Sequence, residues 1–307
     1  MSDAPTSTFE FHLDQLDLGR WLFGGEREHV VAAIRRLDAA VAAREGHGFQ
    51  ATPFDRETDL AAAVGLPASA ELWVKDETGN VSGSHKGRHL FGVAVREALA
   101  PSGGGPWAIA SCGNAALAAS VVARAAQHQL DVFVPTWADD SVVAEIELSG
   151  AVVNRVEREV GRLGDPAHHA MVDAIERGAT AFSCQGTDTP AGIDGGRTLA
   201  FEMVAALAAH DHPTPQHLDR LFVQVGGGAL ATAVVTGLAR CDLPKMPIVH
   251  AVQPVGNHPL VRAWDTLLSE LLDTAPEPTV TGRLAAAAAL GRVASDGRRA
   301  IVHRLES

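Results

Sequence analysis

The sequence predicts an α/β fold in which a mostly parallel sheet is flanked by helices. Short β-rich runs alternate with longer alanine-rich runs of helical periodicity, which is the rhythm of βαβ crossovers. Several of the strand-like runs are apolar throughout, as expected for strands that are covered on both faces. The 307 residues, 46% of them hydrophobic, are enough for two lobes with substantial cores.

Each expected element follows from its local pattern. The first helix spans residues 26–44, where Val30, Ile34, Leu37 and Val41 recur at helical spacing. The expected strands cover residues 71–75, 107–111, 131–135, 151–154, 181–183, 220–225 and 247–253. The further expected helices cover about 84–98, 114–128, 139–149, 165–177, 194–209, 229–240 and 257–272.

Composition excludes several classes of protein. A formal net charge of −12 with only 25 basic residues argues against a nucleic-acid surface. The three widely spaced cysteines include no CxxC pair, so neither a disulfide framework nor a cysteine-rich zinc site is indicated. Residues 106–123 carry no charge, but their central Ser111-Cys112-Gly113-Asn114 favours a strand, turn and helix over a membrane span. We therefore expect a cytoplasmic protein with neither a membrane nor a nucleic-acid partner.

Ligands of open parallel sheets bind beyond the carboxyl ends of the strands, so unusual strand-to-helix turns indicate the site. The first such turn, Ser82-Gly83-Ser84-His85-Lys86, follows strand 71–75. We expect Ser84 to cap the next helix and Lys86 to lie in its first turn. The positive end of a helix dipole suits a lysine that acts as a neutral amine. An exposed helix-start lysine is the alternative interpretation.

The second turn is Ser111-Cys112-Gly113-Asn114-Ala115, between strand 107–111 and an alanine-rich helix. Its small residues let a ligand approach the backbone, and free amides there can bind a carboxylate. The Asn114 side chain can both donate and accept hydrogen bonds. An ordinary turn with an asparagine cap would share this pattern.

The third turn is Gly226-Gly227-Gly228-Ala229, which follows strand 220–225. Three glycines at the start of a helix form a group of amide donors suited to phosphate. The turn lacks the terminal GK[ST] of a Walker A motif and the GxGxxG spacing of dinucleotide folds. A nucleoside-triphosphate hydrolase is therefore disfavoured.

In this order the motifs resemble the fold type II pyridoxal-phosphate enzymes, the tryptophan synthase β-like superfamily of ammonia-lyases, threonine synthase and cysteine synthase. The resemblance covers roughly residues 50–255. It rests on Lys75-x-Glu77, Ser82-Gly83-Ser84-His85-Lys86-x-Arg88, Ser111-x-Gly113-Asn114 and Gly226-Gly227-Gly228-x-Leu230, with Thr52-Pro53 and the run from Gly192 to Glu202 as further landmarks.

The resemblance implies a pyridoxal 5′-phosphate cofactor bound to Lys86 as a Schiff base, with Lys86 as the catalytic base. Asn114 would lie beside the ring hydroxyl, and Gly226, Gly227, Gly228 and Ala229 would hold the phosphate. The substrate would be held by Ser84 and by the turn of Ser111, Cys112, Gly113, Asn114 and Ala115. No metal is expected: His85 and His89 lack a third ligand nearby in the sequence, and helix-surface roles or contacts behind the site are favoured for them.

The implied reaction is β-elimination from a small β-hydroxy amino acid such as serine or threonine. β-Replacement, a threonine-synthase-like reaction, and a catalytically silent binding protein with the same fold are the alternatives. The resemblance also implies a homodimer and two lobes: residues 1–92 with 188–307 for the cofactor phosphate, and residues 93–187 for the substrate carboxylate. Only 53 residues (307 − 254) follow Pro254. We therefore expect a shortened C-terminal part, with no residue assigned to face the ring nitrogen.

Overall fold

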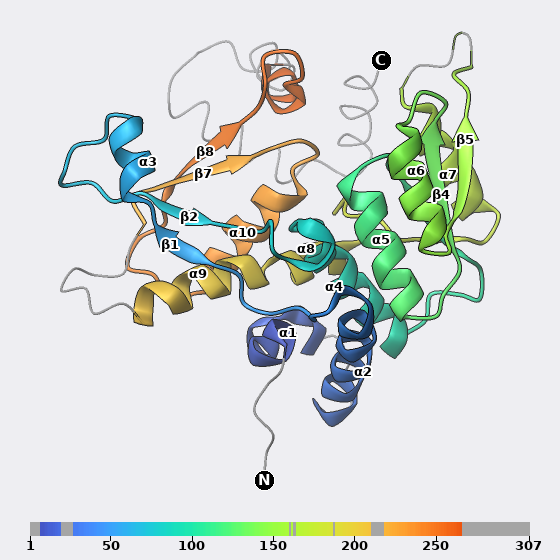
Figure 1. Ribbon diagram of the computed structural model, residues 1–307, viewed down its shortest axis with the longest axis horizontal. Helices are drawn as coiled ribbons and strands as arrows, with labels where there is room; N and C mark the ends of the chain where they lie inside the picture. The colour runs from blue at the N-terminus through green and yellow to red at the C-terminus, as the bar shows by residue number, and fades with distance from the viewer. Residues whose placement is uncertain are drawn as a thin grey trace, which may run out of the picture.

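The computed structural model describes residues 7–19, 27–159, 161, 164–186, 188–209 and 218–265. Within these ranges the strands form three sheets, and helices pack between and around them (Figure 1). No helix in the described ranges has the length and apolarity to cross a membrane.

The largest sheet is parallel and has the order β5-β4-β3-β6. Its strands are β3 (Trp107–Ala110), β4 (Leu130–Pro135), β5 (Val152–Val156) and β6 (Thr180–Ala181). The connecting helices are α5 (Asn114–Ala125), α6 (Asp140–Leu148) and α7 (Pro166–Glu176). Ile109 joins the core cluster that contains α5, whereas the adjacent Ala108 packs with Met171 of α7. This alternation buries both faces of the sheet, as the apolar strand pattern predicted.

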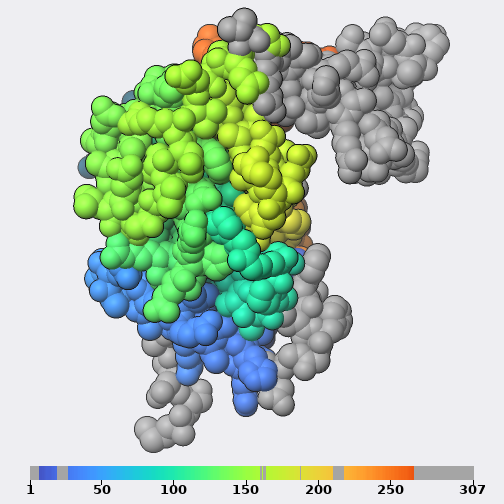
Figure 2. Space-filling model, turned by 90° about the vertical axis from the view of Figure 1, so that its right-hand side faces the viewer, coloured from blue at the N-terminus to red at the C-terminus, as the bar shows by residue number. Residues whose placement is uncertain are grey.

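Figure 2 views this part of the molecule from the side on which the green segment lies. The green and yellow-green atoms of the large sheet and its helices cover the upper part of that face. The blue atoms of the N-terminal third, which includes α2 (Arg27–Glu45), cover the lower part. Val30, Ile34, Leu37 and Val41 of α2 are buried, so the predicted helical spacing marks the face that packs inward.

Two smaller sheets lie together on the other side of the molecule (Figure 1). Strands β1 (Phe54–Arg56) and β2 (Trp73–Lys75) are antiparallel, whereas β7 (Arg220–Gln224) and β8 (Ile248–Val252) are parallel. They share one apolar cluster with α9 (Thr198–Ala209) and α10 (Ala229–Leu238), in which Phe54, Leu199 and Val234 are buried.

Helices α4 (Lys86–Leu99) and α8 (Pro190–Gly196) cross at the centre of the molecule. They approach so closely at Gly92 and Gly195 that a Cβ atom on Gly195 would lie 2.3 Å from the carbonyl oxygen of Arg88. Only glycine fits such a crossing. The glycines between residues 192 and 196, seen in the sequence as a landmark, therefore serve helix packing.

Most expected elements agree with the structure to within a few residues. The helix expected at 194–209 is instead two helices, α8 and α9, divided at Arg197. The first begins earlier than expected because Pro190 suits the first turn of a helix. Strand β1 and helix α3 (Thr58–Ala63) were not expected. Part of the helix expected at 257–272 lies outside the described residues.

Candidate functional site

Lys86 is the first residue of α4 and is half-buried. The prediction that Ser84 caps this helix is wrong, since the residue before the helix is His85. Ser82 (φ 58°) and Gly83 (φ 67°) turn the chain in a short 3-10 segment, and Ser84 then leaves in an extended conformation. The Ser84 side chain therefore does not cap the helix, and Ser84 lies two residues before Lys86 in the chain.

Four buried polar atoms around Lys86 have no hydrogen-bond partner in the described part of the chain. They are Oγ of Ser82 and Ser84, and Nε2 of His85 and His89. A buried polar atom left unpaired costs about 1–3 kcal/mol, so each requires an explanation. Their concentration within eight residues indicates that a polar ligand belongs beside Lys86.

Both histidines are uncharged at neutral pH. Burial, and then the nearby Lys86, lower the pKa of His85 to about 4. Burial, and then His85 and Lys86, lower the pKa of His89 to about 3. The Nδ1 atom of His89 donates to the carbonyl oxygen of Gly192 at 2.8 Å, which leaves Nε2 as an acceptor. Of the two placements favoured for these histidines, the helix surface is wrong for His89, which is fully buried, whereas a contact behind the site stays a prediction. His85 is half-buried.

The glycine turn after β7 leads directly into α10. Gly228 is the residue before the helix and has a left-handed backbone (φ 88°), which glycine adopts without strain. The first amides of α10 have no partners within the helix and are available to an anion. Behind the turn, Nε2 of Gln253 donates to the carbonyl oxygen of Val225 at 2.8 Å and fixes the approach to the glycines.

Helix α8 brings the lysine and the glycine turn together. A Cβ atom on Gly196 would lie 2.4 Å from Cε1 of His89 and 2.8 Å from Cβ of Ala233. His89 is one turn from Lys86, and Ala233 is one turn from Gly228. The first turns of α4 and α10 therefore both pack against the end of α8.

The third turn, Ser111–Ala115, lies at the carboxyl end of β3. Gly113 precedes α5, and Asn114 is the first residue of the helix with an exposed side chain. Helix α5 packs against both α4 and the 3-10 segment 81–83. Cys184 lies beside the start of α4, with its Sγ 3.9 Å from the carbonyl oxygen of Lys86. Burial raises the pKa of its thiol to about 11 and makes it a poor nucleophile.

The landmarks Lys75, Glu77, Arg88 and Glu202 form a buried ion cluster between β2, α4 and α9. Arg88 is fully buried; its guanidinium donates to both oxygens of Glu77 at 2.8 and 3.0 Å and to both oxygens of Glu202 at 2.6 and 2.9 Å. The ammonium of Lys75 donates to Glu202 at 2.6 Å. Burial opposes the charge on Glu202, but Arg88 and Lys75 outweigh burial and lower its pKa.

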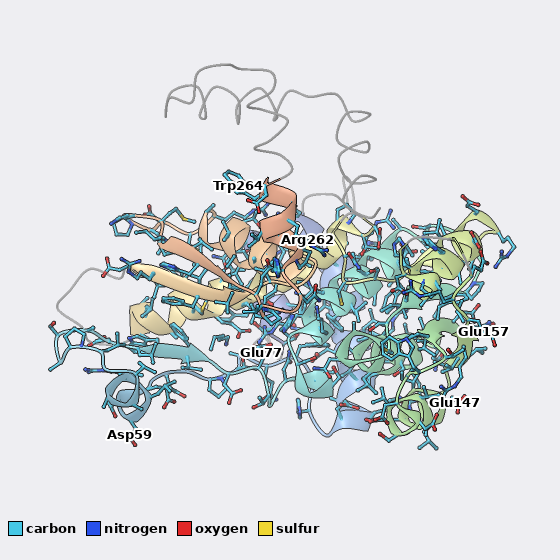
Figure 3. The ribbon with its side chains drawn as sticks, turned by 90° about the horizontal axis from the view of Figure 1, so that it is seen from above. Asp59, Glu77, Glu147, Glu157, Arg262 and Trp264 are labelled. Carbon is cyan, nitrogen blue, oxygen red and sulfur yellow. The ribbon has the colours of Figure 1, made fainter. Side chains whose placement is uncertain are left out.

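The ion cluster fixes the first turn of α4, since Arg88 follows Lys86 by two residues. Figure 3 shows Glu77 in the middle of the molecule, between Asp59 at one end and Glu147 at the other. Sequence reasoning found these residues as landmarks but assigned them no role. It missed Gln253 altogether, since nothing in the local pattern indicates which turn its side chain supports.

No group of three His, Cys, Asp or Glu within the described residues could hold a metal ion. The three turns instead offer a primary amine, amide donors at the starts of helices, and unpaired polar atoms on the residues next to Lys86. Such a set suits a ligand that carries both an anionic group and an electrophilic carbon.

Comparison with known proteins decides the family. Residues 47–302 match the sequence family of pyridoxal-phosphate dependent enzymes. The chain belongs to this family. An L-serine dehydratase of Saccharomyces cerevisiae is 30% identical over 192 residues, which are 60% of this chain and 56% of the dehydratase. The chain thus spans little more than half the length of this curated relative.

Solved structures show the same fold. A fungal L-serine ammonia-lyase from Rhizomucor miehei has a TM-score of 0.56 at 22% identity, covering 72% of this chain and 64% of that one. The serine racemase of Dictyostelium discoideum has a TM-score of 0.58 at 20% identity, covering 78% and 69%.

The site fits the family's cofactor. The glycine turn provides amides for a phosphate, with no Cβ atom at Gly228 to force the backbone out of its left-handed conformation. The unpaired atoms beside Lys86 are those that a polar ligand would be expected to satisfy.

Proposed function

We propose that this protein is a pyridoxal-phosphate-dependent lyase that acts on serine, threonine or a similar small β-hydroxy amino acid by β-elimination. The observation that carries the proposal is the set of four unpaired buried polar atoms within eight residues of chain that include Lys86, whose helix packs with α10 against the same end of α8. The dehydratase relative favours elimination over other reactions of the family.

Lys86 would hold the cofactor through its amine, and the amides from Gly226 to Ala229 would bind the phosphate. Asn114 would lie beside the ring hydroxyl. When bound, the cofactor supplies an electron sink for the pair left at Cα of the substrate.

The substrate would be oriented by the turn Ser111–Ala115, whose amides suit its carboxylate, and by Ser84 from the opposite side. The amine of Lys86 would then accept the Cα proton as general base. The β-hydroxyl would leave as water, and hydrolysis of the released imine by a second water molecule would give a 2-oxo acid and ammonia as the products. Residues 93–187 would form the lobe that carries the substrate turn, and residues 1–92 with 188–307 the lobe that carries the phosphate turn.

A turnover assay tests this proposal. The full chain with added cofactor is expected to release 2-oxo acid and ammonia from L-serine or L-threonine without a second substrate, and Lys86→Ala is expected to abolish release. Release only after a thiol or another nucleophile is supplied would instead indicate β-replacement. A chain that binds the cofactor but turns over neither amino acid would support the silent binding protein.

The homodimer remains a prediction of the resemblance, and the cytoplasmic location remains a prediction from the sequence composition. Sedimentation equilibrium of the cofactor-loaded chain tests the first directly. A mass of one chain at micromolar concentration would contradict it.

A further inference from the structure

The N-terminal arm, defined as residues 7–19, lies before the segment that the family matches. It consists of α1 (Thr8–Phe11) and two short 3-10 segments. Although far from Lys86 in the sequence, it contacts the elements that surround the candidate site. Its contacts differ in kind at its two ends, and both ends are buried against the rest of the chain.

At the first end, the hydroxyl of Thr8 donates to Oε1 of Glu202 at 2.5 Å. The same oxygen accepts from Nη1 of Arg88 at 2.6 Å, while Oε2 accepts from Lys75. Thr8 is 5% exposed and Glu202 4%, so water has little access to this hydrogen bond. Thr8 therefore binds the same carboxylate oxygen of Glu202 that binds Arg88.

The arm is held so that Thr8 has little freedom. The backbone N–H of Thr8 donates to the carbonyl oxygen of Phe49 at 2.8 Å. The ring of Phe9 packs against Phe49 and against Phe91 of α4, with ring centroids 5.5 and 4.6 Å apart. One residue thus binds the ion cluster, and the next packs on the helix that Lys86 begins.

The second end of the arm binds α8 and the end of α10. The backbone N–H groups of Asp17 and Leu18 donate to the two carboxylate oxygens of Asp194 at 2.9 and 2.8 Å. The carboxylate of Asp17 accepts from Arg197 and Arg240, each at 2.6 Å. The arm is therefore fixed to helices on both sides of the candidate site.

We propose that Thr8 is a positioning residue for Lys86. Its hydroxyl fixes the carboxylate of Glu202, Glu202 fixes Arg88, and Arg88 holds the first turn of α4 in the place from which the Lys86 amine reaches the cofactor. The inference rests on the proposed role of Lys86. It adds a segment outside the matched region to the machinery of the site.

The experiment compares Thr8→Val, which keeps the shape and removes the hydroxyl, with Thr8→Ser, which keeps the hydroxyl. The matched control is Arg35→Gln. Arg35 of α2 forms an ion pair with Glu10 of the arm, with 2.6 Å between Nη2 and Oε1, and its removal leaves the ion cluster intact. Thermal unfolding of each full-length variant measures the loss of stability. Two readouts follow Lys86: pyridoxal 5′-phosphate affinity from its visible absorption band, and amide hydrogen exchange of residues 86–91 without cofactor.

Thr8→Val is expected to weaken cofactor affinity roughly ten-fold, because a hydrogen bond to a charged group is lost. It is also expected to speed exchange at the start of α4. Arg35→Gln should change neither the cofactor affinity nor the exchange rate, and Thr8→Ser should keep both close to the values of the wild type. Equal effects of Thr8→Val and Arg35→Gln, or no rescue by serine, would overturn the inference.

The test still gives an answer in two other cases. If the wild-type chain shows no cofactor band, the proposed function fails, yet hydrogen exchange still decides whether Thr8 orders the start of α4. If Thr8→Val does not fold, Thr8→Ala is compared with the same control by the same criteria.

Discussion

The imidazole of His89 is fully buried one helical turn from Lys86, and its pKa of about 3 keeps it neutral throughout the physiological range. In the unfolded chain a histidine binds a proton near pH 6.5. The full contribution of the buried, neutral ring to the free energy of unfolding is therefore present above pH 6.5. It is lost as the pH falls below that value, because only the unfolded chain takes up the proton.

We predict that the free energy of unfolding falls more steeply with acid in the wild type than in His89→Gln. Between pH 6.5 and pH 5, the proton uptake of one such histidine is worth about 1.5 kcal/mol. Urea unfolding of both proteins across this pH range measures the difference. Glutamine is chosen as the replacement because its amide can still donate to the carbonyl oxygen of Gly192. Parallel pH dependences in the two proteins would show that His89 is not held neutral.

At the same scale, the sequence could predict the candidate residues that sit in local motifs, namely Lys86, Asn114 and the glycines 226–228. Their assigned roles stay predictions. Thr8 could not be predicted in this way, since it is 194 positions from Glu202 and no local pattern connects the two. The mistaken cap at Ser84 has a local cause: the strained Ser82 turn delays the helix by two residues.

At the scale of elements, the candidate site consists of helix starts. Helices α5 and α10 begin a few residues after a strand of a parallel sheet, as the alternation of strand and helix predicted, whereas the connection 76–85 separates α4 from β2. The break between α8 and α9 falls in the polar and glycine-containing run 194–198, through which a single helix was expected. The glycines that mark the break serve the close crossing with α4, a tertiary requirement.

We predict that Gly228→Ala lowers the free energy of unfolding by about 1 kcal/mol and weakens cofactor binding. The expected cost comes from the left-handed backbone alone, because an added Cβ atom would meet nothing within 4 Å. Gly226→Ala is the matched control, since its backbone is not left-handed and its nearest contact would lie at an ordinary 3.7 Å. Chemical denaturation of both variants gives the comparison. Equal stabilities would argue that the turn is free to change its conformation.

At the scale of the whole molecule, the buried ion cluster joins the β1–β2 region, α4 and α9 through charges that lie far apart in the sequence. The sequence predicted the α/β class and the parallel sheet, because strand and helix periodicities are local. It could not predict how the three sheets are joined. That depends on long-range ion pairs and on close helix packing.

We predict that Arg88→Met destabilises the protein by about 3–5 kcal/mol, because Glu77 and Glu202 would stay buried with only Lys75 to balance them. The exposed pair of Arg56 and Glu71, 3.3 Å apart, provides the control. Arg56→Met is expected to change the free energy of unfolding by less than about 1 kcal/mol. Urea titrations at neutral pH measure both, and a loss below about 1 kcal/mol for Arg88→Met would mean that the cluster is not what joins these elements.

The central claim is that Lys86 carries the cofactor. It is tested most directly by incubating the full chain with pyridoxal 5′-phosphate, reducing with borohydride and mapping the modified peptide by mass spectrometry. We predict that reduction removes a visible absorption band and leaves a covalent adduct on Lys86, and that Lys86→Ala shows neither the band nor the adduct. An adduct on another lysine, or no band and no adduct at all, would contradict it.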